Sequence, residues 1–211
     1  FDVPTNGTQS DTGAGGEVSG NYAVMNALDN GGITLSNGNL DVTKSGSGYK
    51  SVRGTFGMSS GKWYWEYTRV SGSGNQIVVG ITGAAADLST YLDYSSDGYG
   101  YNGNSGEKVN NNGFSSYGAS FAAGDVVGIA FDADAGSLTF YKNGTSQGTA
   151  FTGLTSGPYF AAISIANGDT GSLNFGQRAF AYGNAGTNRP AATFKALCTT
   201  NLPTPTIADG S

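Results

Sequence analysis

The fold is decided by residues 124–144, GDVVGIAFDADAGSLTFYKNG. Residues 126–131 form a short apolar run rich in β-branched side chains, which indicates a strand buried on at least one face. Turn-forming residues separate this run from a second strand at 138–141. Asn143 and Gly144 then form a strong hairpin signal, because both tolerate the left-handed backbone of a type I′ turn. The stretch therefore predicts two strands and two turns.

The composition favours many short strands separated by turns. The chain has 211 residues, of which 36 are Gly, and 12 Tyr, 11 Phe and 2 Trp are available to fill a core. Few stretches have helical periodicity, so we expect an all-β sandwich or barrel. The net charge is −5 and Lys and Arg are not clustered, which argues against nucleic acid or an anionic membrane as partner. No apolar run approaches the roughly 20 residues of a membrane span, so we expect no membrane insertion.

Several classes of chemistry lack their residues. The chain contains no His, which excludes Ser-His-Asp and Cys-His nucleophile systems and histidine-ligated metals. Cys198 is the single Cys, so the chain cannot form an internal disulfide.

Alternation of side chains predicts further strands around the central stretch. Residues 33–43 have the pattern of a hairpin with its turn at 37–39. In residues 61–68, GKWYWEYT, Trp63 and Trp65 fall on one face of a strand and Glu66 on the other. Exposed Trp side chains can form a sugar-stacking platform, but at period two within a strand we assign them to the core. We expect Glu66 to be solvated or to pair with a cross-strand neighbour.

These motifs together resemble the SPRY family. They occur in the family's order and spacing, and the resemblance covers roughly residues 33–176. The motifs are GKWYWEYT (61–68), VGI (79–81), GYGY (98–101), GDVVGIAFD (124–132) and LTFYKNG (138–144). The resemblance implies a bent antiparallel β-sandwich, a concanavalin-like jelly roll, whose edge loops bind partners and which performs no chemistry.

The flanks carry a second resemblance. Residues 1–13, FDVPTNGTQSDTG, and 194–203, FKALCTTNLP, are similar to SPRY-containing structural proteins of tailed bacteriophages. This resemblance implies a module of a longer tail fibre or decoration protein, located in the virion. We expect residues 1–32 to form an extended arm packed on the domain, 33–176 the sandwich, and 177–211 a connector to a further module. The connector should pack through Phe180, Tyr182, Phe194 and Leu197.

Residues 83–118 are the most irregular part of the chain. They combine Tyr with Ser, Gly and Asn, the composition of adaptable binding loops. Three of their side chains fall in or near the Tyr-Gly motifs of the family, and we interpret these as structural: Tyr99, Tyr101 and Tyr117. The rest of the loop supplies candidates for a solvent-facing surface. The predicted ligand-binding residues are Tyr91, Leu92, Asp93, Tyr94, Asn110, Asn111, Asn112 and Phe114.

Two patterns typical of enzymes are assigned to structure instead. Residues 98–103 match the dinucleotide motif G-x-G-x-x-G, but no helix follows to hold a pyrophosphate. The acidic residues that could form a calcium site or a glycosidase pair are interpreted as turn formers. They are Asp93, Asp97, Glu107, Asp132 and Asp134. We therefore predict no catalytic residue, no metal and no cofactor.

The sequence thus favours a non-enzymatic binding module of a phage virion protein. Its expected partner is a host surface protein or glycan, or another virion protein, and an oligomer through the parent protein is left open. Two alternatives are a carbohydrate-binding or glycan-degrading domain and a purely architectural virion domain.

Overall fold

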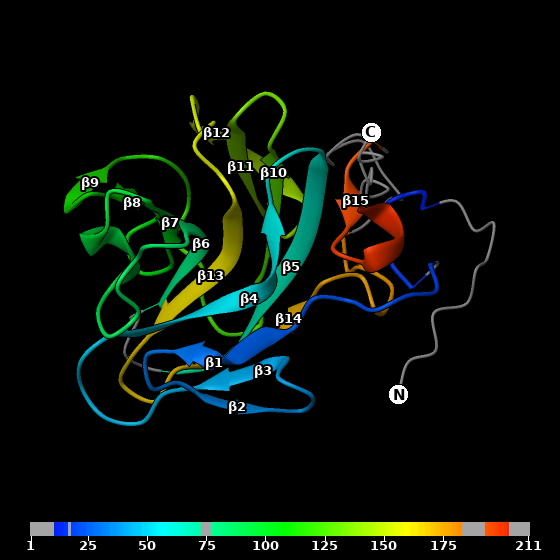
Figure 1. The fold of residues 1–211 in the computed structure, drawn as a ribbon. Helices are drawn as coiled ribbons and strands as arrows, with labels where there is room; N and C mark the ends of the chain where they lie inside the picture. The colour runs from blue at the N-terminus through cyan, green and yellow to red at the C-terminus, as the bar shows by residue number, and fades with distance from the viewer. Residues whose placement is uncertain (1–10, 17, 73–76, 183–192, 203–211) are drawn as a thin grey trace, which may run out of the picture.

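The molecule is a sandwich of two antiparallel sheets (Figure 1). The computed structural model describes residues 11–16, 18–72, 77–182 and 193–202. The first sheet has seven strands, in the order β1 (Met25–Asn30), β4 (Lys50–Met58), β13 (Tyr159–Ile165), β6 (Ile77–Gly83), β7 (Gly98–Asn102), β8 (Lys108–Asn110) and β9 (Gly113–Ser115).

The second sheet is built around β5 (Lys62–Ser71), the longest strand. Its order is β12 (Thr145–Phe151), β11 (Ser137–Lys142), β10 (Val126–Asp132), β5, β14 (Thr170–Asn174), β3 (Asp41–Thr43) and β2 (Thr34–Ser36). The short strand β15 (Lys195–Ala196) pairs with β5 in parallel. The helices of the described part are two 3₁₀ turns, η1 (Leu92–Tyr94) and η2 (Thr199–Asn201), and neither could cross a membrane. The predicted all-β sandwich is confirmed.

The central stretch forms the strands and turns that its pattern predicts. β10 pairs with β11 from Val127 opposite Lys142 onward, and β10 pairs with β5 on its other side. Asn143 and Gly144 have φ angles of 47° and 77°, as the turn between β11 and β12 requires. Every residue of β10 is buried, and the strand lies between β11 and β5 inside the second sheet.

The inner faces of the two sheets enclose an aromatic core. Trp63 and Trp65 are 3% and 1% exposed, which confirms their assignment to the core. Tyr101 is fully buried and Tyr117 packs against the same cluster, so their predicted structural role is also confirmed. Burial raises the pKa of Tyr117 to about 12, so this side chain stays a neutral hydrogen-bonding group at neutral pH.

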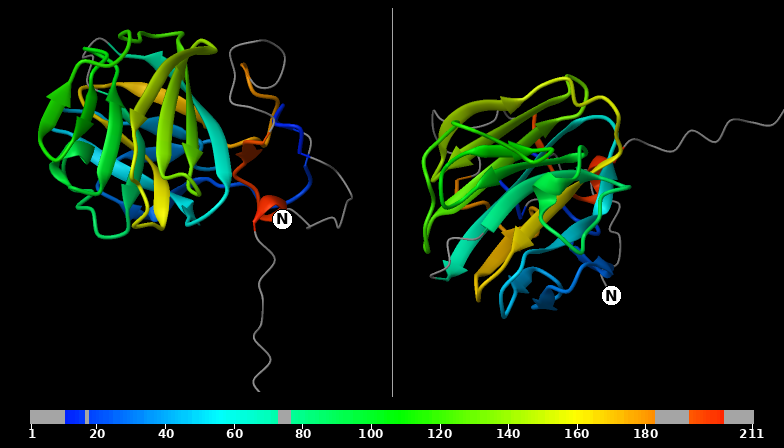
Figure 2. Two further views of the ribbon diagram at one scale, coloured as in Figure 1. Left: turned by 90° about the horizontal axis from the view of Figure 1, so that it is seen from above. Right: turned by 90° about the vertical axis from the view of Figure 1, so that its left-hand side faces the viewer.

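The terminal segments lie side by side at one end of the sandwich (Figure 2). Isolated bridges join Gly15 to Ala179 and Tyr22 to Cys198. The chain then enters the first sheet as β1, which lies within the segment 1–32 that we predicted as an extended arm packed on the domain. The two described ends are therefore fixed to each other as well as to the sheet.

The expectation for Glu66 is wrong. Its side chain is 2% exposed and accepts hydrogen bonds from the backbone N–H groups of Ala181 and Tyr182, at 2.7 and 2.8 Å. The Tyr64 hydroxyl donates a third bond, at 3.1 Å. Desolvation raises the pKa of the Glu66 carboxyl, although these hydrogen bonds oppose the shift. The outer face of β5 is thus covered at Glu66 by residues that follow β14.

Candidate functional site

Several of the predicted binding residues line one hollow at the edge of the first sheet. This aromatic hollow has a volume of about 210 Å³. It combines residues around η1 with the end of β7 and the β8–β9 hairpin, and its lining residues are Tyr49, Tyr91, Tyr94, Asn102, Asn112 and Phe114. Side chains far apart in the sequence therefore meet at one surface.

Tyr91 forms the fixed centre of the aromatic hollow. It is 5% exposed, and its ring stacks on Phe114 with centroids 6.4 Å apart and planes 19° apart. Tyr49 and Tyr94 make edge contacts with it at centroid distances of 4.0 and 6.2 Å. The Tyr91 hydroxyl also accepts a hydrogen bond of 3.0 Å from the Asn102 amide. Tyr94 and Phe114 are 59% and 51% exposed, so two accessible rings flank a buried one.

The β8–β9 hairpin holds the exposed rim of the aromatic hollow in place. Asn111 and Asn112 have φ angles of 49° and 59°, which match the two central positions of a type I′ turn. The Asn110 amide donates to the carbonyls of Ser96 and Gly98, at 3.0 and 2.7 Å. Asn110 thus anchors the hairpin, while the two residues after it are exposed at its tip.

The structure corrects part of the predicted surface. Tyr94, Asn111, Asn112 and Phe114 are exposed as expected. The prediction that Tyr91 and Leu92 face solvent is wrong, because they are 5% and 2% exposed.

Leu92 packs in a small apolar cluster, and its backbone N–H donates to the Ser164 hydroxyl at 2.9 Å. The side chain of Asp93 lies outside the described part of the chain. Sequence reasoning missed Tyr49, because it precedes β4 and is distant along the chain from the irregular segment. It also missed Asn102, which lies within that segment at the end of β7 but directly follows the Tyr-Gly motif assigned to structure.

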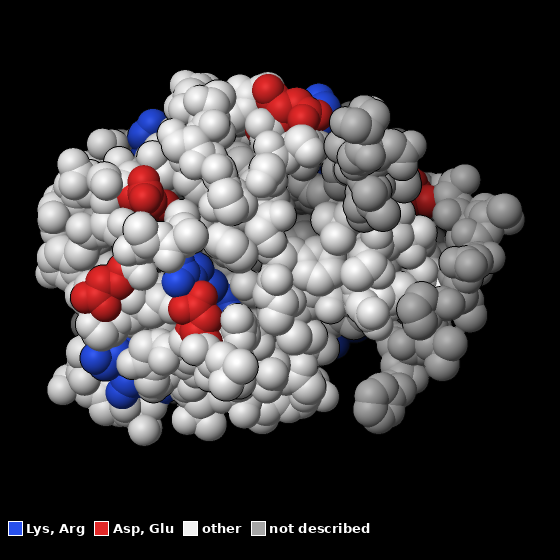
Figure 3. Space-filling model, in the orientation of Figure 1, with Lys and Arg blue, Asp and Glu red and all other residues white. Residues whose placement is uncertain are grey.

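Two of the acidic residues that we interpreted as turn formers, Asp132 and Asp134, lie at the turn between β10 and β11. Asp134 accepts a hydrogen bond of 2.7 Å from the Gly61 N–H. Asp132 forms an ion pair with Lys62 at 2.7 Å and accepts a bond from the Ala135 N–H at 2.9 Å. Desolvation opposes ionisation of Asp132, but these bonds together hold its pKa below the usual value. Within the described residues, no group of three or more Cys, Asp or Glu side chains is placed to hold a metal. Figure 3 shows the acidic side chains of one face scattered over it.

Comparisons with known proteins agree with this architecture. The family model of the SPRY domain matches residues 62–178. The E3 ubiquitin-protein ligase RKP of Arabidopsis thaliana is 32% identical over 138 residues, which is 64% of this chain and 11% of that protein. Ran-binding protein 9 of Xenopus tropicalis is 31% identical over 159 residues, which is 71% of this chain and 29% of that protein.

The solved structures include a similar fold. The crystal structure of the SPRY domain of human HERC1 superimposes with a TM-score of 0.64 at 20% identity, and the match covers 71% of this chain and 96% of that one. The named relatives are eukaryotic and give no support to a phage origin. This chain spans less than a third of the length of either curated relative, so their matched parts are segments of larger proteins.

Proposed function

Because the chain belongs to the SPRY family, whose members mediate protein–protein interactions, we propose that its aromatic hollow binds a segment of a partner protein. One observation carries the proposal: Tyr94 and Phe114, both more than half exposed, flank the buried ring of Tyr91. Large aromatic side chains that stay exposed beside a preformed hollow are typical anchors of protein interfaces.

The size of the aromatic hollow favours a protein side chain as its occupant. Its volume of about 210 Å³ lies below the roughly 300–1,000 Å³ of typical small-molecule sites. One apolar or aromatic side chain of a partner would fill it and cover the rings of Tyr94 and Phe114. The buried contacts of Tyr91 fix the floor before binding, so little conformational entropy would be lost there.

The neighbouring backbone supports the same function. β9 is the last strand of the first sheet, and all three of its residues, Gly113–Ser115, are exposed. Among the described residues, β9 pairs on one side only, with β8. An extended segment of the partner could pair with the free side of β9, while one side chain of the partner enters the aromatic hollow.

A location on a phage virion is part of our proposal and rests on the flanks alone. Residues 1–13 and 194–203 resemble phage structural proteins, and the first ten lie outside the described part of the chain. The partner would then be a host surface molecule or another virion subunit. Many copies on one particle would offset a weak affinity at each single site.

The test begins with a selection that does not require the partner to be known. The immobilised chain is used to select binders from a library of displayed random peptides, and their affinity is measured for the wild type and for the double variant Tyr94→Ala/Phe114→Ala. We expect at least a tenfold loss in the double variant, because both accessible anchors are removed.

The matched control removes an exposed apolar side chain at another edge of the first sheet. Leu28, on β1, is 98% exposed, so Leu28→Ala should leave peptide binding unchanged. Equal binding by the wild type and the double variant would overturn the proposal. Binding of the labelled chain to candidate bacterial cells, presented as a multimer, then tests the host-surface role with the same three proteins.

A further inference from the structure

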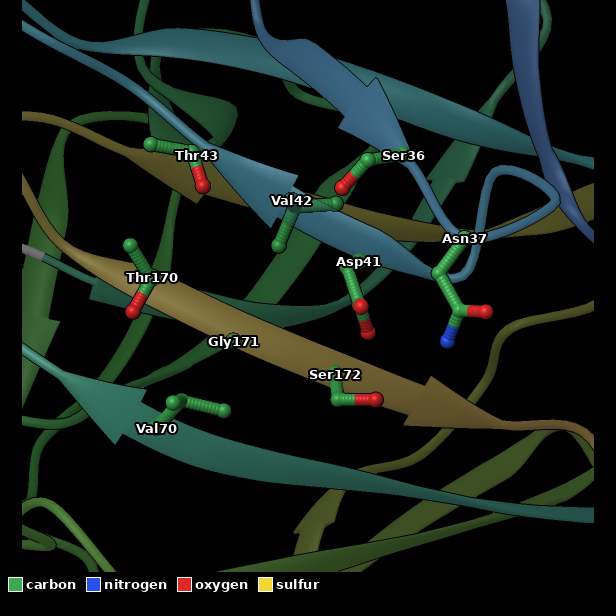
Figure 4. A pocket seen from close by; sticks show the side chains of 9 residues that line it. All are labelled: Ser36, Asn37, Asp41, Val42, Thr43, Val70, Thr170, Gly171 and Ser172. Carbon is green, nitrogen blue, oxygen red and sulfur yellow. The ribbon is translucent and has the colours of Figure 1, made fainter.

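A second hollow opens on the outer face of the other sheet (Figure 4). Its volume is about 390 Å³, and β2, β3, β14 and the end of β5 form it. We call it the hydroxyl hollow, and its lining residues are Ser36, Asn37, Asp41, Val42, Thr43, Val70, Thr170, Gly171 and Ser172.

Strand register places the polar groups of the hydroxyl hollow on one face. Asp41 lies opposite Ser172, and Thr43 lies opposite Thr170, across the antiparallel pair β3 and β14. Val42, between the two β3 positions, is fully buried in the core. Because side chains alternate along a strand, Asp41 and Thr43 point outward from a rigid sheet. Figure 4 shows the side chains from neighbouring strands gathered around the same hollow.

Most of these polar side chains are free to bind a ligand. In the described part of the chain, no hydrogen bond involves the side-chain oxygens and nitrogens of Ser36, Asn37, Asp41, Thr43 and Ser172. The hydroxyl of Thr170 is engaged, since it lies 2.6 Å from that of Ser71. The surface thus presents one carboxylate, one primary amide and three hydroxyls.

The charge of the hydroxyl hollow restricts the class of ligand. Asp41 is the one charged residue in the lining, and no Lys or Arg accompanies it. An anionic ligand would meet a carboxylate without a counter-charge. A single carboxylate is also too few ligands for a stable metal site. A neutral ligand with several hydroxyl groups satisfies both restrictions.

The polar and apolar side chains of the hydroxyl hollow match the hydroxyl groups and the C–H groups of a sugar ring. Sugar hydroxyls can donate to the carboxylate of Asp41 and can both donate to and accept from the amide of Asn37. Val70 is 56% exposed at the border and offers an apolar contact for the C–H groups of the ring. We propose that the hydroxyl hollow binds a neutral sugar residue of a glycan. This inference is independent of the protein-binding role of the aromatic hollow.

The expected affinity for a single sugar is low. The hollow lies within the volume range of small-molecule sites, about 300–1,000 Å³, but it is a surface depression lined by short side chains. A dissociation constant on the order of 1 mM corresponds to about −4 kcal/mol, which a few hydrogen bonds can supply. Useful affinity for a cell surface would need several copies of the site.

The test is an NMR titration of the uniformly ¹⁵N-labelled full chain with three separate probes: methyl α-mannoside, methyl β-galactoside and N-acetylglucosamine. We expect saturable amide shifts for at least one probe, confined to residues 36–43, 70 and 170–172. Asp41→Asn keeps the side-chain shape but removes its charge, and it should weaken binding at least tenfold. Glu107→Gln removes one carboxylate immediately before β8 of the other sheet, outside both hollows, and should leave binding unchanged.

Three outcomes would overturn the proposal. The first is the absence of saturable shifts with all three sugars and on an array of neutral glycans probed with a multimer of the chain. The second is a set of shifts centred on Tyr94 and Phe114, which would assign the sugar to the aromatic hollow. The third is equal binding by the wild type and Asp41→Asn. Phe114→Ala separates the two proposals, because it should affect peptide binding and leave sugar binding unchanged.

Discussion

Substitution of Asp169 by Asn tests how the hydroxyl hollow is held on the sheet. Asp169 precedes β14 and forms an ion pair with Arg69 of β5, with an Nη2–Oδ1 distance of 2.8 Å. The side chains are 0% and 1% exposed. Arg69 also donates to the carbonyl of Phe121 at 3.1 Å. Asp169→Asn preserves the shape but removes the negative charge that faces the guanidinium.

Burial determines the expected size of the effect. Removing one partner of a buried ion pair costs about 3–5 kcal/mol, because the remaining charge stays desolvated. Asn can still accept a hydrogen bond from Arg69, so we expect the low end, about 3 kcal/mol. The pair between Lys142 and Asp125 is longer, at 3.3 Å, and its side chains are 26% and 20% exposed. Breaking that pair by Lys142→Met should cost less than about 1 kcal/mol.

Urea unfolding measures both effects in the same assay. Trp63 and Trp65 are buried in the core, so their fluorescence reports the global transition. A cycle with Arg69→Met isolates the pair, and the double variant should lose at least about 1 kcal/mol less than the sum of the single variants. The reasoning is refuted if Asp169→Asn costs no more than Lys142→Met, or if the cycle is additive.

Three further predictions address other parts of the molecule. Burial raises the pKa of Glu66 above its unfolded value of 4.5. Between the unfolded and the folded pKa, the native state retains a proton that the unfolded state has released. The free energy of unfolding should therefore fall as pH rises through that window. Urea unfolding from about pH 4 to 7 should give a flatter profile for Glu66→Gln, and an unchanged profile would contradict the assignment. Tyr91→Ala should cost about 3–5 kcal/mol in the same assay, whereas Tyr94→Ala should cost less than about 1 kcal/mol, and equal losses would count against a buried floor and an exposed rim. Gly171→Ala would place a methyl group 2.1 Å from Cε2 of Tyr67 and should destabilise the fold by about 1–3 kcal/mol. A urea-unfolding midpoint equal to that of the wild type would show that this contact can relax.

The strands could be predicted because their signals are local. The alternation in residues 61–68 identifies Trp63 and Trp65 as inward-facing from neighbouring residues alone. The turn at Asn143 needs only the residue types that tolerate a left-handed backbone. Each of these features depends on a few adjacent positions, so a single sequence contains the necessary information.

Local patterns could not predict which outward-facing residues are buried by other segments of the chain. Alternation places Glu66 on the outer face of β5, but its hydrogen-bond partners are Ala181 and Tyr182, far along the chain. Leu92 was assigned to a solvent-facing loop, yet its backbone is tied to Ser164 on β13. Both errors arise from contacts between distant segments, which composition and periodicity do not encode.

The terminal segments cover one part of the outer face of β5 and leave the rest exposed. Tyr64 is buried there and packs edge-on against Phe180, with ring centroids 4.9 Å apart, and β15 pairs with β5 beside it. Beyond Glu66 the neighbouring strand is β14, no longer β15, and Val70 on the same outer face is exposed. The hydroxyl hollow is accessible because this cover stops before Val70. A substitution at Glu66 should therefore change the docking of the terminal segments without changing sugar binding. Asp41→Asn should weaken sugar binding without changing the docking of the terminal segments.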